Sequence, residues 1–337
     1  MRHIVYIGNK VSKASKANLS SIDVLSKRLF DEGFKVTSAS HKKNIILRLF
    51  HMLYVCFKNR KSANYVLIDT YSTLNFYYAF LVSALCRIFK LKYIPILHGG
   101  KLPNRLKTSP KLSKFIFNNA YVNVAPSAYL GSQFKTFGFN NVTNIPNAIE
   151  IDNYPFKKRQ FKEVKLLWVR AFSKIYNPLL AIKILKSLKL EGIDASLCMV
   201  GPDVDGSLND ARQFAKSQKL NVTFTGKLTK KEWIALSKEY NIFINTTNFD
   251  NMPVSVIEAM ALGLPVISTN VGGLPYLIQH EKTGVLVEPN NVEPFVNYIN
   301  LFRLNSSYAC QLGVNARSYV EGFNWEKIKK QWANLLE

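Results

Sequence analysis

The chain alternates short apolar runs with segments of helical periodicity, and this alternation starts a second time after residue 150. In the first part, strands are predicted over 3–7, 35–39, 65–69, 93–97 and 121–124, and helices over 19–30, 43–59, 73–89 and 127–137. Strands that alternate with helices form a parallel sheet covered by helices on both faces. The first 150 residues therefore predict one α/β domain of this kind.

The second part repeats the order of elements. Its predicted strands are 164–169, 195–200, 222–224, 242–245, 265–269 and 284–287, and its predicted helices include 178–190, 210–218, 230–239 and 253–262. Residues 151–163 between the two parts are polar, basic and interrupted by Pro155, which is typical of a linker. Two tandem sheets predict a cleft between their carboxyl edges, where such folds bind ligands.

Charge is distributed unequally between the two parts. The 337 residues carry a formal net charge of +23, and residues 1–162 hold 26 Lys and Arg against 6 Asp and Glu. A folded half this basic favours nucleic acid, an anionic membrane or acidic ligands as its partner, and charge alone does not distinguish them. The four cysteines are far apart, which indicates reduced thiols of a cytosolic protein and excludes a CxxC zinc site.

Membrane-targeting patterns are weak. The N-terminal apolar run spans about five residues, shorter than the roughly 7–15 of a secretory signal. The most apolar stretches, 45–57 and 74–89, are interrupted by polar residues and are shorter than the about 18–20 residues that cross a bilayer. We therefore expect a cytoplasmic protein that is soluble or peripheral.

Candidate site residues stand where predicted strands end. Asp250 lies in a loop and Glu258 in the helix after it, and a carboxylate can accept hydrogen bonds from the vicinal hydroxyls of a sugar. Arg170 follows a strand and Lys174 comes four residues later, so both cations could neutralise a diphosphate. His98 follows another strand and precedes two glycines. Each residue taken singly also has a structural explanation: the two acids as capping or solvated residues, the two cations as surface residues, and the histidine as part of the fold.

The segment 248–273 resembles the signature of the family-4 retaining glycosyltransferases. That pattern is an acid, seven residues, then Glu-Ala-Met-Ala-x-Gly-x-Pro-Val, and here Asp250 is followed after seven residues by Glu258 and AMALGLPV. The family has the GT-B architecture, in which two Rossmann-like domains have parallel sheets facing an interdomain cleft. Two departures are Asp250, where the family usually has Glu, and Pro253, where it often has glycine.

The resemblance implies roles for individual residues. The catalytic group would be Arg170, Lys174, Asp250 and His98, with the two cations stabilising the departing nucleoside diphosphate. The donor-binding group would be Glu258, Val254, Asn251, Met252, Gly272 and Gly273, with Glu258 binding the nucleotide ribose. No metal or other cofactor is expected. We interpret Asp203-Val204-Asp205, which matches the metal motif of a different glycosyltransferase architecture, as a solvated turn.

The resemblance covers nearly the whole chain. Pro146-Asn147-Ala148 is similar to the family's Pro-Asn-Gly at the end of the first domain, which implies domains at 1–150 and 164–321. Residues 322–337 are similar to the family's last helix, which packs back on the first domain. The first loop, 8–21, lacks the family's paired glycines, so no acceptor contacts are assigned there.

Basic segments of the first domain suggest a surface for the acceptor. Residues 40–62 form a predicted apolar helix with basic ends, and further candidates for acceptor or membrane contact are Arg48, Lys101, Arg105 and Lys107. Such a segment suits an anionic lipid surface, and it also fits a helix buried on its apolar face with solvated ends. The hypothesis is a protein peripheral on the inner face of the cell membrane.

The predicted reaction is transfer of a hexose from a nucleotide sugar to a saccharide acceptor, with retention of the anomeric configuration. The expected acceptor is a lipid-diphosphate-linked saccharide or an oligosaccharide. UDP is the first nucleotide expected and GDP the second. The family implies bacterial surface polysaccharide assembly. One alternative is a sugar-nucleotide epimerase on the same fold. Another is a nucleic-acid-binding protein, although the chain has no helix-turn-helix, RNP or zinc-finger signature, so nucleic acid is not expected as a partner.

Overall fold

The computed structural model describes residues 1–10 and 20–337. They form two compact units, one of Met1–Asn147 with Glu326–Glu337 and the other of Ala148–Trp325. Most of the first loop considered above, residues 11–19, lies outside the described residues. Of the helices in the described ranges, none combines the length and apolar character needed to cross a membrane.

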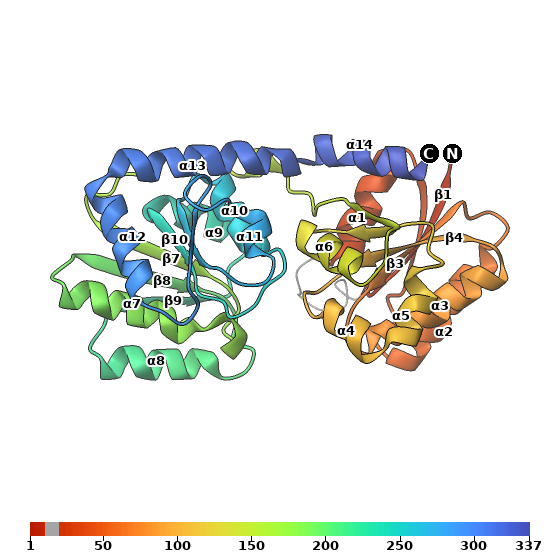
Figure 1. The fold of residues 1–337 in the computed structure, drawn as a ribbon, viewed down its shortest axis with the longest axis horizontal. Helices are drawn as coiled ribbons and strands as arrows, with labels where there is room; N and C mark the ends of the chain where they lie inside the picture. The colour runs from red at the N-terminus through yellow and green to blue at the C-terminus, as the bar shows by residue number, and fades with distance from the viewer. Residues whose placement is uncertain (11–19) are drawn as a thin grey trace. The chain divides into compact units, whose positions relative to one another are not determined.

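The first unit is built on a parallel sheet covered by helices (Figure 1). The sheet has six strands in the order β2-β1-β3-β4-β5-β6. Its strands are β1 (His3–Ile7), β2 (Lys35–Ala39), β3 (Tyr65–Thr70), β4 (Lys92–Leu97), β5 (Asn123–Ala125) and β6 (Val142–Asn144). Its helices are α1 (Ser21–Asp31), α2 (Ile45–Lys58), α3 (Asn75–Ile88), α4 (Leu102–Thr108), α5 (Pro110–Phe117), α6 (Ala128–Thr136) and α14 (Trp325–Leu336).

The second unit also has a six-stranded parallel sheet, in the order β12-β11-β10-β7-β8-β9. Its strands are β7 (Val164–Val169), β8 (Ala195–Val200), β9 (Val222–Gly226), β10 (Ile242–Asn245), β11 (Val266–Thr269) and β12 (Val285–Val287). Its helices are α7 (Pro178–Leu190), α8 (Ser207–Ser217), α9 (Lys230–Leu236), α10 (Val254–Ala261), α11 (Leu274–Leu277), α12 (Glu293–Leu304) and α13 (Ser306–Val320). The predicted fold of two parallel α/β sheets is confirmed.

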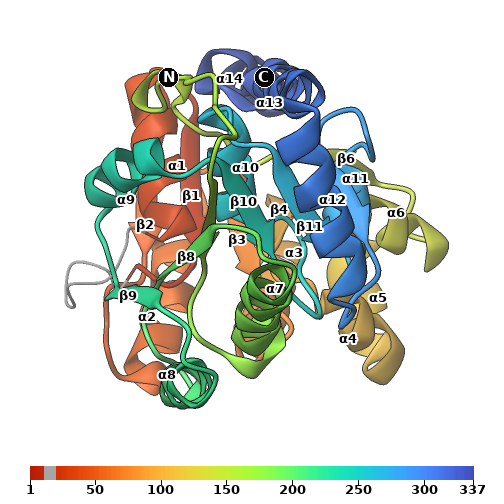
Figure 2. The ribbon, with the colours of Figure 1, turned by 90° about the vertical axis from the view of Figure 1, so that its left-hand side faces the viewer.

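Burial on both faces explains why the central strands are continuous apolar runs. Every residue of β1, β3 and β10 is buried, as expected for parallel strands covered by helices on both sides. In the second unit, side chains of α7, α8 and α12 form the core on one face of the sheet, and those of α9, α10 and α11 form the core on the other (Figures 1 and 2).

Each sheet has one point where the strand order reverses direction. In the second unit this point lies between β7 and β10, and in the first unit it lies between β1 and β3. Successive crossovers turn to opposite sides there, which leaves a crevice at the carboxyl ends of the two strands. The two reversal points therefore indicate where each unit offers a ligand site.

Several segments differ from the sequence-based expectation. Strand β6 and helices α4 and α5 of the first unit were not predicted, and neither were helices α11, α12 and α13 of the second unit. Residues 151–163, predicted as a linker, belong to the second unit, and Tyr154, Arg159 and Phe161 are buried within it. The buried Arg159 guanidinium donates hydrogen bonds to the carbonyl oxygens of Ser237, Tyr240 and Leu262 at 2.7–3.0 Å, which fixes the segment in place.

The C-terminal helix packs within the first unit. The Arg2 guanidinium donates a hydrogen bond to the carbonyl oxygen of Leu336 over 2.6 Å, and the Lys329 ammonium group lies 3.3 Å from the Glu32 carboxylate. Trp332 and Leu336 of α14 are buried. The last twelve residues thus contribute to the same compact unit as the N-terminal strand.

Candidate active site

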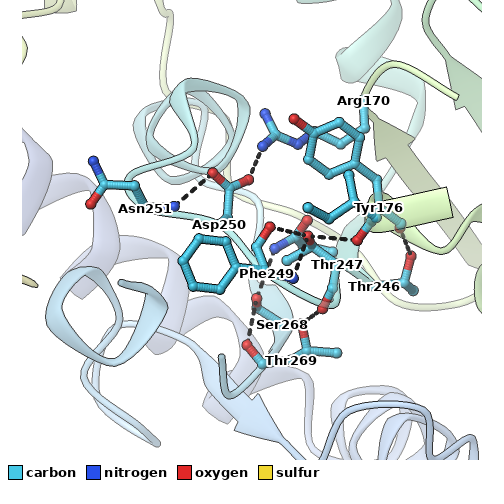
Figure 3. Close-up of polar contacts among 11 residues, drawn as sticks. Arg170, Tyr176, Thr246, Thr247, Phe249, Asp250, Asn251, Ser268 and Thr269 are labelled. Carbon is cyan, nitrogen blue, oxygen red and sulfur yellow. Dashed lines mark hydrogen bonds and ion pairs between the residues drawn. The ribbon is translucent and has the colours of Figure 1, made fainter. Parts of the chain in front are cut away.

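The reversal point of the second unit gathers several polar side chains (Figure 3). Strands β7 and β10 are hydrogen-bonded neighbours, so the loop after β7 and the loop after β10 leave the sheet side by side. Arg170 lies in the first loop and Asp250 in the second. Strand β11 pairs with β10 and brings Gly272 and Gly273 to the same edge.

Arg170 and Asp250 form an ion pair between their guanidinium and carboxylate groups. The Arg170 guanidinium also lies 4.2 Å from the centre of the Tyr176 ring. Burial lowers the pKa of Arg170 below its usual range, and the neighbouring Tyr176 partly offsets this effect. The Asp250 carboxylate accepts a second hydrogen bond, 2.8 Å long, from the backbone N–H of Asn251. Two predicted catalytic residues therefore meet in a partly desolvated place.

Two buried threonines that follow β10 hold these loops together. The Thr246 hydroxyl accepts a hydrogen bond from the Trp168 indole over 3.0 Å and contacts the carbonyl oxygens of Tyr176 and Asn177. The carbonyl oxygen of Thr247 accepts a hydrogen bond from the Thr269 hydroxyl over 2.6 Å. The loops after β7, β10 and β11 are thus tied to one another, although sequence reasoning identified neither threonine.

Gly272 and Gly273 allow the loop of Asp250 to lie directly against their backbone. The N–H of Gly273 donates a hydrogen bond to the carbonyl oxygen of Asp250 over 2.8 Å. A Cβ atom at Gly273 would come within 1.8 Å of the carbonyl oxygen of Asn251. The paired glycines are therefore required by the packing of one loop on the other, independently of any ligand.

Substitution of Gly273 by alanine should lower the stability of the fold, because the added methyl group must displace the backbone at Asn251. Overpacking of this kind costs about 1–3 kcal/mol. Gly322→Ala is a matched control, since a Cβ there meets no atom within 4 Å. Thermal unfolding measures both variants, and an unchanged midpoint for Gly273→Ala would show that the loop contact is wrong.

Glu258 lies on α10 and is buried, with a relative exposure of 4%. Its Oε1 accepts a hydrogen bond of 2.6 Å from the Tyr154 hydroxyl and lies 2.6 Å from the Lys230 ammonium group on α9. The buried carboxylate is thus matched by one cation and one hydroxyl donor. Sequence reasoning missed both partners, since Tyr154 stood in the predicted linker and Lys230 is one of many lysines.

The remaining predicted site residues differ in their exposure to solvent. Asn251 and Met252 are half-buried, and Val254 is exposed at the start of α10. Lys174 is exposed, and its backbone N–H donates a hydrogen bond of 2.9 Å to the Asp205 carboxylate. Hydrogen bonds to Asp205, first from the Ser207 hydroxyl and then from the N–H of Lys174, lower its pKa to about 2.

The Asp203-Val204-Asp205 segment therefore serves local structure. Asp203 accepts a hydrogen bond of 3.0 Å from the N–H of Gly206 just before α8, and Asp205 positions the loop that carries Lys174. Within residues 1–10 and 20–337, no cluster of three or more His, Cys, Asp or Glu side chains is arranged to hold a metal ion.

The reversal point of the first unit holds a second polar cluster. His98 follows β4, and its Nε2 lies 2.8 Å from Oδ1 of Asp69 at the end of β3. The Tyr6 hydroxyl on β1 donates a hydrogen bond to the same oxygen over 2.8 Å. The Tyr71 ring stacks on the imidazole with the ring centres 5.0 Å apart. Asp69 and Tyr71 therefore contact His98 directly, and Tyr6 on β1 supports Asp69.

Asp69 is the central residue of this cluster. Its relative exposure is 1%. The backbone of Gly8 lies close to it, since a Cβ atom at Gly8 would come within 2.4 Å of the Asp69 Oδ2. Burial and the Asp69 charge raise the pKa of Tyr6 and of Tyr71, so both phenols stay protonated. A carboxylate beside Nε2 favours the tautomer with the proton on that nitrogen, which leaves Nδ1 for a ligand. Asp69 is the only acid between residues 33 and 149, a signal that sequence reasoning did not use.

The predicted acceptor residues are dispersed over the first unit. Arg105 on α4 donates a hydrogen bond of 3.1 Å to the carbonyl oxygen of Ser72 and lies 5.5 Å from the centre of the Tyr77 ring. It therefore stands at the same edge of the sheet as His98. Lys101 and Lys107 are exposed beside it, whereas Arg48 lies half-buried on α2.

Two Rossmann-like units, each built on a six-stranded parallel sheet, have the fold of the GT-B class of glycosyltransferases. Residues 150–319, just over half of the chain, match the family described as glycosyl transferases group 1. The chain belongs to this family.

Similar proteins include curated relatives and solved structures. A putative colanic acid biosynthesis glycosyltransferase, WcaL of Escherichia coli, is 34% identical over 27% of this chain and 23% of its own length. A GDP-mannose-dependent mannosyltransferase of Mycobacterium tuberculosis is 27% identical over 34% of this chain and 32% of its own. Matches to the first curated relatives span less than half of their lengths.

A solved structure extends the similarity of fold to the whole chain. The crystal structure of HepE from Anabaena in complex with UDP superposes with a TM-score of 0.77 and 15% identity, covering 100% of this chain and 99% of that one. At this identity the likeness concerns the fold alone.

Proposed function

We propose that the chain transfers a hexose from a nucleotide sugar to a saccharide acceptor with retention of the anomeric configuration. The observation that carries the proposal is the contact of Arg170 with Asp250 at the reversal point between β7 and β10. The buried Glu258 lies in α10, the helix that follows the loop of Asp250. A cation for a diphosphate and two acceptors for sugar hydroxyls stand together there.

The proposed donor pose follows from these charges. The diphosphate takes the place of the Asp250 carboxylate beside Arg170, and Lys174 adds a second cation. Asp250, once released, accepts hydrogen bonds from the hexose hydroxyls. Glu258 accepts from the ribose hydroxyls while Lys230 keeps the buried carboxylate neutralised. Asn251, Met252, Val254 and the Gly272-Gly273 backbone line the same loops.

The proposed chemical step needs no covalent intermediate. The bond between the anomeric carbon and the phosphate oxygen breaks, and the acceptor oxygen forms the new glycosidic bond on the same face of the sugar. The acceptor proton passes to the departing phosphate oxygen. Arg170 and Lys174 stabilise the charge that develops on the diphosphate, so catalysis consists of positioning and electrostatic stabilisation. For His98, the family resemblance implies a role in recognition of the hexose.

In this proposal Arg170 and Lys174 supply the charge that a metal would otherwise provide, so transfer needs no metal or other cofactor. Loss of activity in EDTA that manganese restores would contradict this. For the donor, UDP is proposed first and GDP second. The UDP complex of HepE supports the former, and the GDP-mannose-dependent relative supports the latter.

The proposed acceptor is a lipid-diphosphate-linked saccharide in the assembly of a surface glycan, with the protein peripheral on the inner face of the membrane. The relative named for colanic acid biosynthesis supports the glycan. The excess of 26 Lys and Arg over 6 Asp and Glu in residues 1–162 supports an anionic acceptor.

A thermal-shift screen of UDP- and GDP-sugars tests the proposal, followed by transfer assays on lipid-linked saccharides. One nucleotide sugar should raise the unfolding temperature of the chain but not that of Glu258→Gln, which retains the side-chain shape without the charge. Product analysis separates transfer from epimerisation of the donor. If no nucleotide sugar stabilises the protein and no acceptor is modified, the proposed function is wrong.

A further inference from the structure

Helix α2 is apolar on two faces, and only one of them is covered. Met52, Val55 and Cys56 point into the core of the first unit. Four large side chains on the opposite side are 47–64% exposed, at intervals of four, four and three residues: Ile46, Phe50, Tyr54 and Phe57. This spacing places them in one stripe along the helix.

Helix α3 lies against α2 and carries a similar stripe. Leu49 and Leu53 of α2 and Leu85 of α3 pack on the same part of the core, which sets the two helices side by side. The Phe57 and Phe89 rings meet at the ends of the helices, with their centres 5.8 Å apart. Four side chains at the start and on the outer side of α3 are 38–71% exposed: Leu74, Tyr77, Leu81 and Ile88. We call these eight side chains the α2–α3 face.

The charge around the α2–α3 face has one sign. Residues 33–149 contain 16 Lys and Arg and a single acid, the buried Asp69. Cations flank the ends of both helices: Lys42, Lys43, Lys58, Arg60, Lys61, Arg87 and Lys90. Exposed apolar side chains with cations at the helix ends, in a segment whose one acid is buried, suit a partner that is apolar inside and anionic at its surface.

We propose that the α2–α3 face inserts into an anionic lipid bilayer and holds the first unit on the membrane. The charge favours an anionic bilayer over a second copy of the chain as the partner of this face, since two copies would bring two cationic borders together. A bilayer also covers an elongated apolar face without needing a matching groove.

The α2–α3 face begins beside the cluster of Asp69 and His98. Helices that follow parallel strands start at the carboxyl edge of the sheet, so Leu74 and Tyr77 of α3 stand close in sequence to Asp69 and Tyr71. Arg105 packs against Tyr77 at this edge. A bilayer seated on the α2–α3 face would present the headgroup of a lipid-linked saccharide at the edge where His98 lies. This step rests on the proposed function, whereas the insertion itself does not.

Vesicle co-sedimentation tests the insertion with phosphatidylglycerol–phosphatidylcholine vesicles and with phosphatidylcholine alone. The chain should bind the anionic vesicles, and Phe50→Ser/Tyr54→Ser should weaken that binding at least about tenfold, because two apolar side chains no longer leave water. Leu190→Ser/Leu304→Ser is the matched control, since these leucines of the second unit are 77% and 76% exposed. It should bind like the unchanged protein.

A second variant distinguishes insertion from simple charge attraction. In the Phe50→Trp variant, the emission of the new indole should shift to the blue on anionic vesicles, whereas that of Leu304→Trp should not. The native tryptophans are buried and contribute a constant background. Substitution of Lys42 and Lys43 by glutamine should lower affinity about fivefold per cation at low salt.

Several outcomes would overturn the proposal. These are equal binding by the Phe50→Ser/Tyr54→Ser variant, no preference for anionic vesicles, or a dimer in solution that this variant dissociates. None of these measurements uses sugar transfer. A failed donor screen together with normal vesicle binding would reject the proposed function alone, and the reverse result would reject the insertion alone.

Discussion

Replacing Arg170 by alanine should lower turnover with the nucleotide sugar by about 100- to 1,000-fold, the range for loss of one group that stabilises charge in the transition state. The departing diphosphate would lose the buried cation beside it and keep only the exposed Lys174. Steady-state kinetics at saturating donor measure the effect, which should appear in kcat more than in KM.

The same substitution also leaves Asp250 without its cation. An uncompensated, partly buried charge destabilises a fold by several kcal/mol, about 3–5 where burial is complete. Arg170→Ala/Asp250→Asn removes both charges and should recover most of the lost unfolding temperature. Turnover of the double variant should stay low, which separates the role of this ion pair in the reaction from its role in stability.

Arg159→Met provides the comparison for an arginine that only supports the fold. Its guanidinium binds three carbonyl oxygens away from the reversal point, so the substitution should lower the unfolding temperature and leave kcat unchanged at temperatures where the protein is folded. If Arg170→Ala turns over as fast as Arg159→Met, Arg170 does not stabilise the leaving group.

Much of the fold was predictable because parallel strands buried on both faces leave a simple trace in the sequence. Strands β1, β7 and β10 match their predicted ranges, since nearly every residue in them is apolar. Helices α4 and α5 are short, and each has proline in its first turn, so neither shows a full helical period. Strand β6 has only three residues and no apolar run.

Part of the candidate site was predictable because a spaced motif connects Asp250 with Glu258 along one loop and helix. Its partners come from elsewhere in the chain. The Tyr154 hydroxyl meets Glu258 across 104 positions, and Trp168 meets Thr246 across 78. Such pairs depend on which strands become neighbours in the sheet. Local periodicity contains no information on that pairing, so sequence reasoning missed these supports.

Asp69 is the clearest example of a supporting residue that the sequence did not reveal, because its contacts form only where strands β1, β3 and β4 meet. Asp69→Asn should lower turnover about 10- to 100-fold, since a hydrogen bond to a charged group contributes about 1.5–3 kcal/mol and the amide lacks the charge. The substitution has nearly the same volume, so the crowded contact with Gly8 is kept. Nitrogen chemical shifts of the His98 ring should show the proton on Nε2 in the unchanged protein and a mixture of tautomers in the variant.

Tyr6→Phe separates the charge of Asp69 from the packing around it. This variant removes the other donor to the same carboxylate oxygen and leaves the carboxylate beside His98, so turnover should fall less than about tenfold, as for loss of one neutral hydrogen bond. The tautomer is measured without substrate, so it reports on Asp69 even if the donor is still unidentified. An Asp69→Asn protein that keeps the Nε2 proton and full turnover would show that Asp69 only fills space, and His98 would then be oriented by Tyr71 alone among these neighbours.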